Sequence, residues 1–202
     1  MKLRIATADD AAAIAAIYAH YVTQTAVSFE TEPPGEDEVR SRIADAGALY
    51  PWIVAEESDQ DVLGYAYAAA FRSRRAYRFS VETTVYLDPA ATGRGVGRAL
   101  YTALIPLLER QGFTQAIAAI TLPNDPSVRL HEAFGFAQAG VYREVGFKLG
   151  KWRSVGLWQR SLAPVADNPE EPRPFAPYWT GEGPPGPISS PPSAPGSSPP
   201  AR

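Results

Sequence analysis

The feature that most constrains the fold is a predicted strand that runs into a glycine-rich turn and then a helix, at residues 83–100. Gly93, Gly95 and Gly97 occupy alternate positions of the turn, and two arginines lie beside them. The start of a helix leaves N–H groups unpaired and carries a partial positive charge. Because glycines let an anion approach the backbone closely, this turn suits a pyrophosphate group, although a plain turn has the same composition.

Two other phosphate-binding loops are excluded by the residues around the turn. A Rossmann loop belongs to the first βαβ unit and is followed about 20 residues later by an acidic residue. Here three predicted strands precede the turn, and the strand after it ends in Ala-Ala-Ile-Thr121. A nucleoside-triphosphate loop would end in Gly-Lys-Ser/Thr, which is missing.

Hydrophobic periodicity predicts an α+β or mixed α/β domain. Ile14, Ile17 and Tyr21 lie on one face of a helix that follows a capping pair, Thr7 and Asp10. The segments after the second helix alternate as strands of an antiparallel meander. The other predicted helices cover residues 36–46, 95–111 and 126–134, and the predicted strands cover residues 3–5, 50–56, 62–71, 79–87, 114–121, 140–147 and 152–161.

The composition changes after residue 163. Of the 20 prolines in the chain, 13 lie in residues 164–202, so this segment buries too little apolar area to offset the entropy of ordering. We therefore predict a folded domain at 1–163 and a disordered tail at 164–202. Three aromatic residues of the tail form either a docking motif for a partner or a patch that packs on the domain, namely Phe175, Tyr178 and Trp179.

Composition also narrows the class of protein. Without cysteine there is no disulfide and no thiolate site, and two distant histidines, His20 and His131, argue against a metal centre. A net charge of −3 without a basic stripe argues against nucleic acid as a partner. No apolar run is long enough to cross a bilayer, and acids follow the N-terminus closely. We expect a cytoplasmic protein with neither a metal nor a membrane partner.

The turn is followed by a strand and then by Leu122-Pro-Asn-Asp-Pro-Ser-Val-Arg-Leu-His-Glu-Ala-Phe-Gly-Phe136. This combination resembles the acetyl-CoA site of GNAT acetyltransferases. Within that superfamily, nearly all of residues 1–163 resembles the phosphinothricin (methionine sulfoximine) acetyltransferases. The matching segments are residues 28–33, 50–52, 76–77, 81–86, 122–136 and 158–160.

The resemblance implies acetyl-CoA as cosubstrate, with the pantetheine arm paired to one strand and the pyrophosphate in the glycine turn. One position departs from the superfamily pattern, because Thr92 stands where Gln or Arg is preferred. We expect Arg94 to supply the missing polarity. The implied cofactor-binding residues are Val85, Tyr86, Leu87, Gly93, Arg94, Gly95, Val96, Gly97, Arg98, Asn124 and Ser127.

Two residues are candidates for proton transfer. Strand alternation places Glu82 on the face opposite Val81 and Thr83. A half-buried carboxylate there serves as an ion-pair partner or, as the resemblance implies, as the base that deprotonates the amine. His131 would protonate the departing thiolate, assist Glu82, or be structural, and His20 is expected at the surface or in packing. A backbone N–H near Val85 would stabilise the oxyanion.

The substrate pocket is expected between two strands of the meander. Arg72, Arg74 and Arg75 form a positive cluster that suits a carboxylate and a second anionic oxygen, unless it is a charged turn facing solvent. By the resemblance, Arg72, Arg74 and Tyr77 line the amino-acid pocket and Phe29 forms an apolar wall.

The leading hypothesis is an N-acetyltransferase that acts on the α-amino group of L-phosphinothricin, L-methionine sulfoximine or a similar glutamate-like amino acid. The resemblance also implies a homodimer. A GNAT enzyme for another amine, such as a protein N-terminus, would be expected to have an acidic groove in place of the arginines. A non-catalytic acetyl-CoA sensor or scaffold is disfavoured because both Glu82 and His131 are retained.

Overall fold

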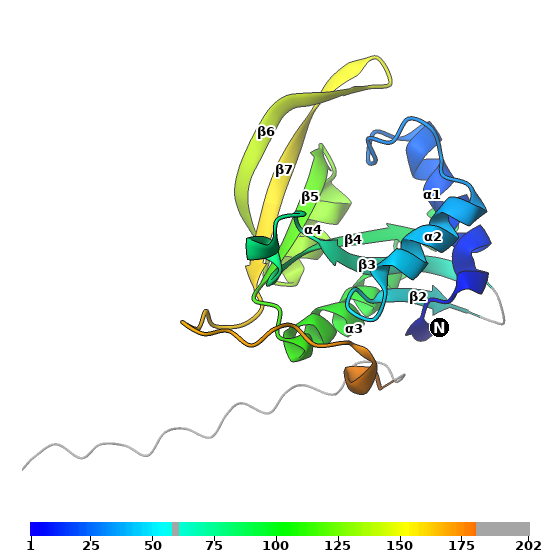
Figure 1. Cartoon of the computed structure of the whole chain (residues 1–202). Helices are drawn as coiled ribbons and strands as arrows, with labels where there is room; N and C mark the ends of the chain where they lie inside the picture. The colour runs from blue at the N-terminus through cyan, green and yellow to red at the C-terminus, as the bar shows by residue number, and fades with distance from the viewer. Residues whose placement is uncertain (58–60, 181–202) are drawn as a thin grey trace, which may run out of the picture.

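A computed structural model describes residues 1–57 and 61–180 of the chain, and Figure 1 shows their arrangement around one sheet. The sheet has seven strands in the order β1-β2-β3-β4-β5-β7-β6. The strands are β1 (Lys2–Ile5), β2 (Trp52–Glu56), β3 (Val62–Ala70), β4 (Ser80–Leu87), β5 (Gln115–Leu122), β6 (Ala137–Lys148) and β7 (Lys151–Ser161). The α-helices are α1 (Ala11–Gln24), α2 (Glu36–Ala46), α3 (Val96–Gln111) and α4 (Asp125–Ala133).

Helices cover the sheet from both sides. On β2, Ile53 packs in the cluster that contains Leu104 of α3, whereas its neighbour Val54 packs in the cluster that contains Ile14 of α1. Both side chains are fully buried, which explains the continuous apolar run of this strand. The mixed α/β class predicted from the sequence is confirmed. Among the described helices, none has the length and apolar character to cross a membrane.

The sheet opens in its middle, because β4 and β5 pair over only a few residues. As predicted, β2, β3 and β4 form an antiparallel meander. The next pair, β4 and β5, is parallel and consists only of Ser80, Val81 and Glu82 with residues 115–117. Beyond these pairs β5 stays bonded to β7 through Leu122. The last residues of β4 therefore present an edge on which the described chain places no further strand.

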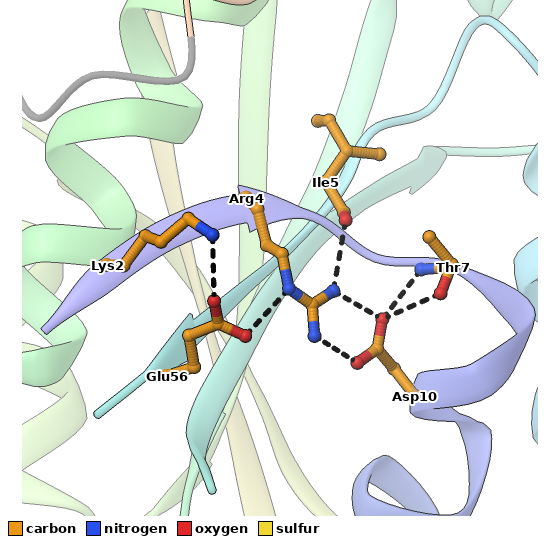
Figure 2. A network of polar contacts seen from close by, with 6 residues as sticks. All are labelled: Lys2, Arg4, Ile5, Thr7, Asp10 and Glu56. Carbon is orange, nitrogen blue, oxygen red and sulfur yellow. Dashed lines mark hydrogen bonds and ion pairs between the residues drawn. The ribbon is translucent and has the colours of Figure 1, made fainter. Parts of the chain in front are cut away.

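A partly buried ionic network joins the first strand to β2 and to the start of α1 (Figure 2). The guanidinium of Arg4 binds the carboxylates of Asp10 and Glu56, each at 2.7 Å, and Lys2 adds an ion pair to Glu56 at 3.2 Å. Asp10 also accepts the N–H of Thr7 at 2.7 Å, which confirms the predicted capping pair. Burial alone would raise the pKa of Asp10, but the hydrogen bonds from Arg4 and Thr7 lower it overall. The network therefore holds β1, β2 and the start of α1 together.

The chain after β7 packs back on the domain, contrary to prediction. In residues 162–180, which we call the C-terminal strap, Arg173 exchanges two 2.8 Å hydrogen bonds with Gln111 of α3, and the N–H of Phe175 binds the carbonyl of Ala48 at 3.0 Å. Its aromatic side chains, Phe175, Tyr178 and Trp179, pack against the α3 cluster, which is the second of the two alternatives considered for them from the sequence. The boundary at 163 and disorder from 164 are thus wrong for residues 164–180, and residues 181–202 lie outside the described chain.

Candidate active site

A slot opens where β4 and β5 separate. Residues 83–86 form one wall, and residues 118–121 form the other. At its end lie the N-cap of α4, Asn124, and two residues of that helix, Ser127 and His131. A neighbouring cavity of about 260 Å³ extends past Leu87 to Thr92, at the turn before α3. The slot and this cavity together form a path from the middle of the sheet to the glycine turn, which suits an extended polar chain that ends in an anion.

The predicted turn before α3 is present, and two of its glycines have a left-handed backbone. Gly93 and Gly95 have φ angles of +77° and +80°, a left-handed conformation that side chains with a Cβ rarely adopt. The first helical bond of α3 runs from the N–H of Ala99 to the carbonyl of Gly95, at 3.0 Å. The three preceding N–H groups therefore have no acceptor within the helix, and they belong to Val96, Gly97 and Arg98.

Close packing explains why residue 97 is a glycine. A Cβ on Gly97 would lie 3.3 Å from Leu130 of α4 and 3.6 Å from Leu87 of β4. The start of α3 therefore sits tightly between the strand and the helix that border the slot. Arg98 is exposed on the first turn of α3. The guanidinium of Arg94 instead binds Glu57 at 2.6 Å, so Arg94 must exchange this partner before it can compensate for Thr92.

Glu82 lies on β4 at the last residue paired with β5. It shares the α1 face of the sheet with Tyr86, whose ring centroid is 4.9 Å from that of Tyr18. Burial raises the pKa of the Glu82 carboxyl, and the positive charge of Arg72 opposes that rise. A half-buried carboxylate with a raised pKa beside the opening has the properties of a general base.

His131 is buried, and both of its ring nitrogens are engaged. Nδ1 lies 2.7 Å from the carbonyl oxygen of Ser127, and Nε2 lies 2.9 Å from the hydroxyl of Tyr101. Since a carbonyl only accepts, Nδ1 carries the proton and Nε2 accepts from the tyrosine. Burial also lowers the pKa of the imidazole, so the ring is neutral near pH 7.

The sheet separates His131 from Glu82. Tyr101 belongs to α3 and packs with Val81, whereas Glu82 points to the opposite face. The two proton-transfer candidates therefore do not meet directly. Among the described residues no hydrogen bond joins the two side chains, so assistance of Glu82 by His131, one of the roles considered from the sequence, stays a prediction.

The arginines of the predicted cluster lie in the turn after β3, where they have different partners. Arg72 stacks its guanidinium 5.1 Å from the ring centroid of Phe71 and 6.0 Å from that of Tyr77. The positive charge of Arg72 also opposes the rise in the pKa of Glu82. Arg75 turns away and forms an ion pair with Glu171 of the C-terminal strap at 3.7 Å. Arg72 and Tyr77 thus stay together, whereas Arg75 leaves the cluster.

The two remaining substrate candidates occupy separate places. Arg74 is exposed and directly precedes the short 3-10 helix Arg75–Tyr77. Phe29 lies in the loop between α1 and α2 and packs against the backbone of Gly146 on β6. The predicted apolar wall is therefore supported by the β6–β7 hairpin.

Two buried polar residues near the slot were not identified from the sequence. Tyr101 is fully buried and binds His131, and Lys148 is only 6% exposed at the end of β6. A tyrosine on the apolar face of a predicted helix was the available signal for Tyr101. For Lys148 the local pattern contained no such signal, since its partners lie over a hundred residues earlier in the chain. Among the described residues, no group of three acidic, histidine or cysteine side chains is placed to hold a metal.

A sequence model described as an acetyltransferase (GNAT) domain matches residues 3–154. The chain belongs to the GNAT acetyltransferase family. This GNAT acetyltransferase is 43% identical over 177 residues to the phosphinothricin N-acetyltransferase of Streptomyces viridochromogenes, with 88% of this chain and 94% of the relative covered. It is 48% identical over 164 residues to that of Alcaligenes faecalis, with coverages of 79% and 82%.

The same relationship is found among solved structures. The crystal structure of a phosphinothricin acetyltransferase from Sinorhizobium meliloti, in complex with AcCoA, has a TM-score of 0.80 and 41% sequence identity to this GNAT acetyltransferase. The match covers 84% of this chain and 92% of that one. The fold and family inferred from the glycine turn and the segment 122–136 are therefore confirmed.

Proposed function

We propose that the protein transfers an acetyl group from acetyl-CoA to the α-amino group of L-phosphinothricin, L-methionine sulfoximine or a similar glutamate-like amino acid. One structural observation supports this most directly: the half-buried carboxylate of Glu82 lies on β4 at the last pair with β5, where the sheet opens. The identities of 43% and 48% to phosphinothricin N-acetyltransferases support the substrate class.

In this proposal the slot holds the cofactor. The pantetheine arm would pair with the free edge of β4 beyond Glu82, in the way an added strand does. Its pyrophosphate would lie on the unpaired N–H groups at the start of α3, where the helix dipole favours an anion. The thioester end would lie near the side chains of Asn124 and Ser127. The backbone residues that contact the arm and the pyrophosphate are Val85, Tyr86, Leu87, Gly93, Arg94, Gly95, Val96, Gly97 and Arg98.

The chemistry begins with Glu82. Its carboxylate takes a proton from the substrate ammonium, directly or through a water, and the free amine attacks the thioester carbonyl. A backbone N–H near Val85 stabilises the oxyanion, and the C–S bond then breaks. The attacking nitrogen loses its second proton as the amide forms, and this proton passes to the departing thiolate, so that the products are the acetylated amine and free CoA. For His131 we propose a positioning role, because donation of the Nδ1 proton would break its 2.7 Å bond to the Ser127 carbonyl.

Recognition of the amino acid is assigned to the turn after β3. The guanidinium of Arg72 is already oriented by two aromatic rings, so its planar donors are available to a carboxylate or a phosphinyl oxygen. Arg74 would supply the second positive charge, and Tyr77 and Phe29 would form the walls of the pocket. A protein N-terminus would instead require a groove that accepts an extended cationic chain.

The first experiment measures free CoA release with acetyl-CoA and L-phosphinothricin or L-methionine sulfoximine. We expect turnover with at least one amine and a loss of about 100-fold or more in kcat for Glu82→Gln, which removes the base but keeps the shape. A peptide with a free N-terminus serves as the competing substrate. Turnover of the peptide alone would contradict the substrate class, and an active Glu82→Gln variant would contradict the assigned base.

We further propose that the enzyme is a cytoplasmic homodimer that associates through the β6–β7 hairpin. Figure 1 shows this hairpin projecting beyond the rest of the sheet. The hairpin exposes large apolar side chains that a monomer would leave in water. They are Tyr142, Val145, Phe147, Leu149 and Trp152, and the last is 62% exposed.

A further inference from the structure

A buried lysine joins the β6–β7 hairpin to the loop between α1 and α2. Nζ of Lys148 donates to the carbonyl of Ser28 at 2.6 Å and to the carbonyl of Glu30 at 2.8 Å. A buried ammonium is unfavourable unless strong acceptors replace its water. Burial accordingly lowers the pKa of Lys148, and the charge of Glu30 opposes that change. The two carbonyls flank a single residue, Phe29.

The ring of Phe29 lies directly on the hairpin. A Cβ built on Gly146 would be 2.2 Å from Cε2 of Phe29 and 2.5 Å from its Cζ, so only glycine leaves room for the ring in this position. Lys148 holds the backbone on both sides of Phe29, and Gly146, two residues earlier on the same strand, accommodates its side chain. The hairpin thus determines both the path of the loop and the place of the ring.

Other contacts fix the two ends of the loop. Thr121 donates to the carbonyl of Val27 at 3.2 Å, and the hydroxyl of Tyr18 lies 2.7 Å from that of Ser28. The carboxylate of Glu30 is bound by Arg42 at 2.9 Å. The N–H of Glu30 also donates to the hydroxyl of Ser28 at 3.1 Å, so these bonds hold the residues on both sides of Phe29. Among the described side chains, Lys148 alone binds the two backbone carbonyls beside Phe29.

We propose that Lys148 is a positioning residue for substrate specificity, which holds Phe29 as the apolar wall of the amino-acid pocket from the far hairpin. This inference rests on the proposed function, in which Phe29 borders the substrate. It predicts that loss of Lys148 weakens binding of the amino acid more than binding of acetyl-CoA. The loop residue that lines the proposed cofactor path, Val27, is held by Thr121 and not by Lys148.

The test replaces Lys148 by methionine, which keeps the length of the side chain but removes its donors. The matched control is Lys151→Met, since Lys151 is exposed and pairs with Lys148 across the same hairpin. We expect Lys148→Met to raise KM for L-phosphinothricin at least about tenfold, the effect of losing hydrogen bonds from a charged donor. KM for acetyl-CoA and kcat should change less than about twofold. Lys151→Met should resemble the wild type.

A second pair of variants disturbs the ring without altering the lysine. Gly146→Ala places a Cβ where the ring of Phe29 lies, whereas Gly140→Ala on the same strand has nothing within 4 Å of the added Cβ. We expect the first variant to raise KM for the amino acid selectively and the second to have no effect. Phe29→Ala combined with Lys148→Met should be no worse than Phe29→Ala alone, because both changes remove the same wall.

Amide hydrogen exchange of residues 25–31 provides a readout that does not depend on turnover. Faster exchange in Lys148→Met than in Lys151→Met supports the proposal. Unchanged exchange overturns it, as do additive effects of the Phe29 and Lys148 variants or an equal rise of both KM values. If the wild type acetylates neither amine, the proposed function fails, and unchanged exchange would overturn the role of Lys148 separately.

Discussion

At the scale of single residues, two buried charges near the site are stabilised differently. Lys148 keeps its proton because two backbone carbonyls replace its water, and this suits a fixed structural group. Glu82 has no side-chain hydrogen bond among the described contacts and has only the field of Arg72 to favour its charged form. Such a carboxylate gains and loses its proton readily, which suits a base.

The raised pKa of Glu82 predicts the acid limb of the pH profile. Because burial raises this pKa above 4.5, the carboxyl stays protonated to a higher pH, and kcat/KM should rise as the pH increases through the shifted value. Arg72→Ala removes the charge that opposes the shift, so its acid limb should move to a higher pH. The measurement is kcat/KM from pH 4 to 9. A limb that moves to lower pH in Arg72→Ala would contradict the interaction.

At the scale of elements, β4 has no hydrogen-bonded neighbour on its β5 side beyond Glu82, next to the proposed active site. Its pairing with β5 ends at Glu82, while its pairing with β3 continues to Leu87. One strand therefore contributes to the sheet on one side and offers free backbone groups on the other. The C-terminal strap is the opposite case, a proline-rich segment that covers α3 and accepts a hydrogen bond from Nε2 of Gln111 through the carbonyl of Arg173.

Removal of the strap should destabilise the domain. A chain that ends at residue 163 leaves the fully buried Gln111 without the Arg173 carbonyl and uncovers the aromatic contacts on the α3 cluster. We expect a decrease in Tm of about 5–10 °C, which corresponds to roughly 2–4 kcal/mol. The control chain ends at residue 180 and keeps every contact described above. Equal Tm values for the two chains in differential scanning calorimetry would show that the strap adds no stability.

At the scale of the whole molecule, the two halves of the sheet diverge and the β6–β7 hairpin extends beyond the core (Figure 1). The hairpin exposes apolar side chains and holds the Phe29 loop through Lys148. Association through this hairpin would therefore stabilise the wall of the substrate pocket as well as the dimer. An exposed apolar surface of this kind is typical of an interface between copies of one chain.

The dimer is tested by a charge placed at the hairpin. Trp152→Glu introduces a carboxylate at the largest exposed apolar side chain, and Val165→Glu introduces it at an 81% exposed position outside the hairpin. By light scattering after size exclusion, the wild type and Val165→Glu should have about twice the chain mass of 21.8 kDa. Trp152→Glu should have the mass of one chain. A wild type of one chain mass would refute the dimer.

The sequence by itself determined what depends on near neighbours along the chain. The glycine turn, the helix that follows it and the strand alternation around Glu82 are local properties, so these elements were predictable, while their roles in cofactor binding and proton transfer stay predictions. The helix Glu36–Ala46 was predicted with its observed ends for the same reason.

Only the tertiary structure decided which distant groups meet. The early end of the β4–β5 pairing, the bonds of His131 to Tyr101 and Ser127, and the packing of the strap depend on contacts that no local pattern encodes. Lys148 reaches carbonyls more than a hundred residues away, so its burial follows from the path of the whole chain. Local conformational preferences determine where each helix and strand forms. Hydrogen bonding and burial between these elements determine which side chains become partners.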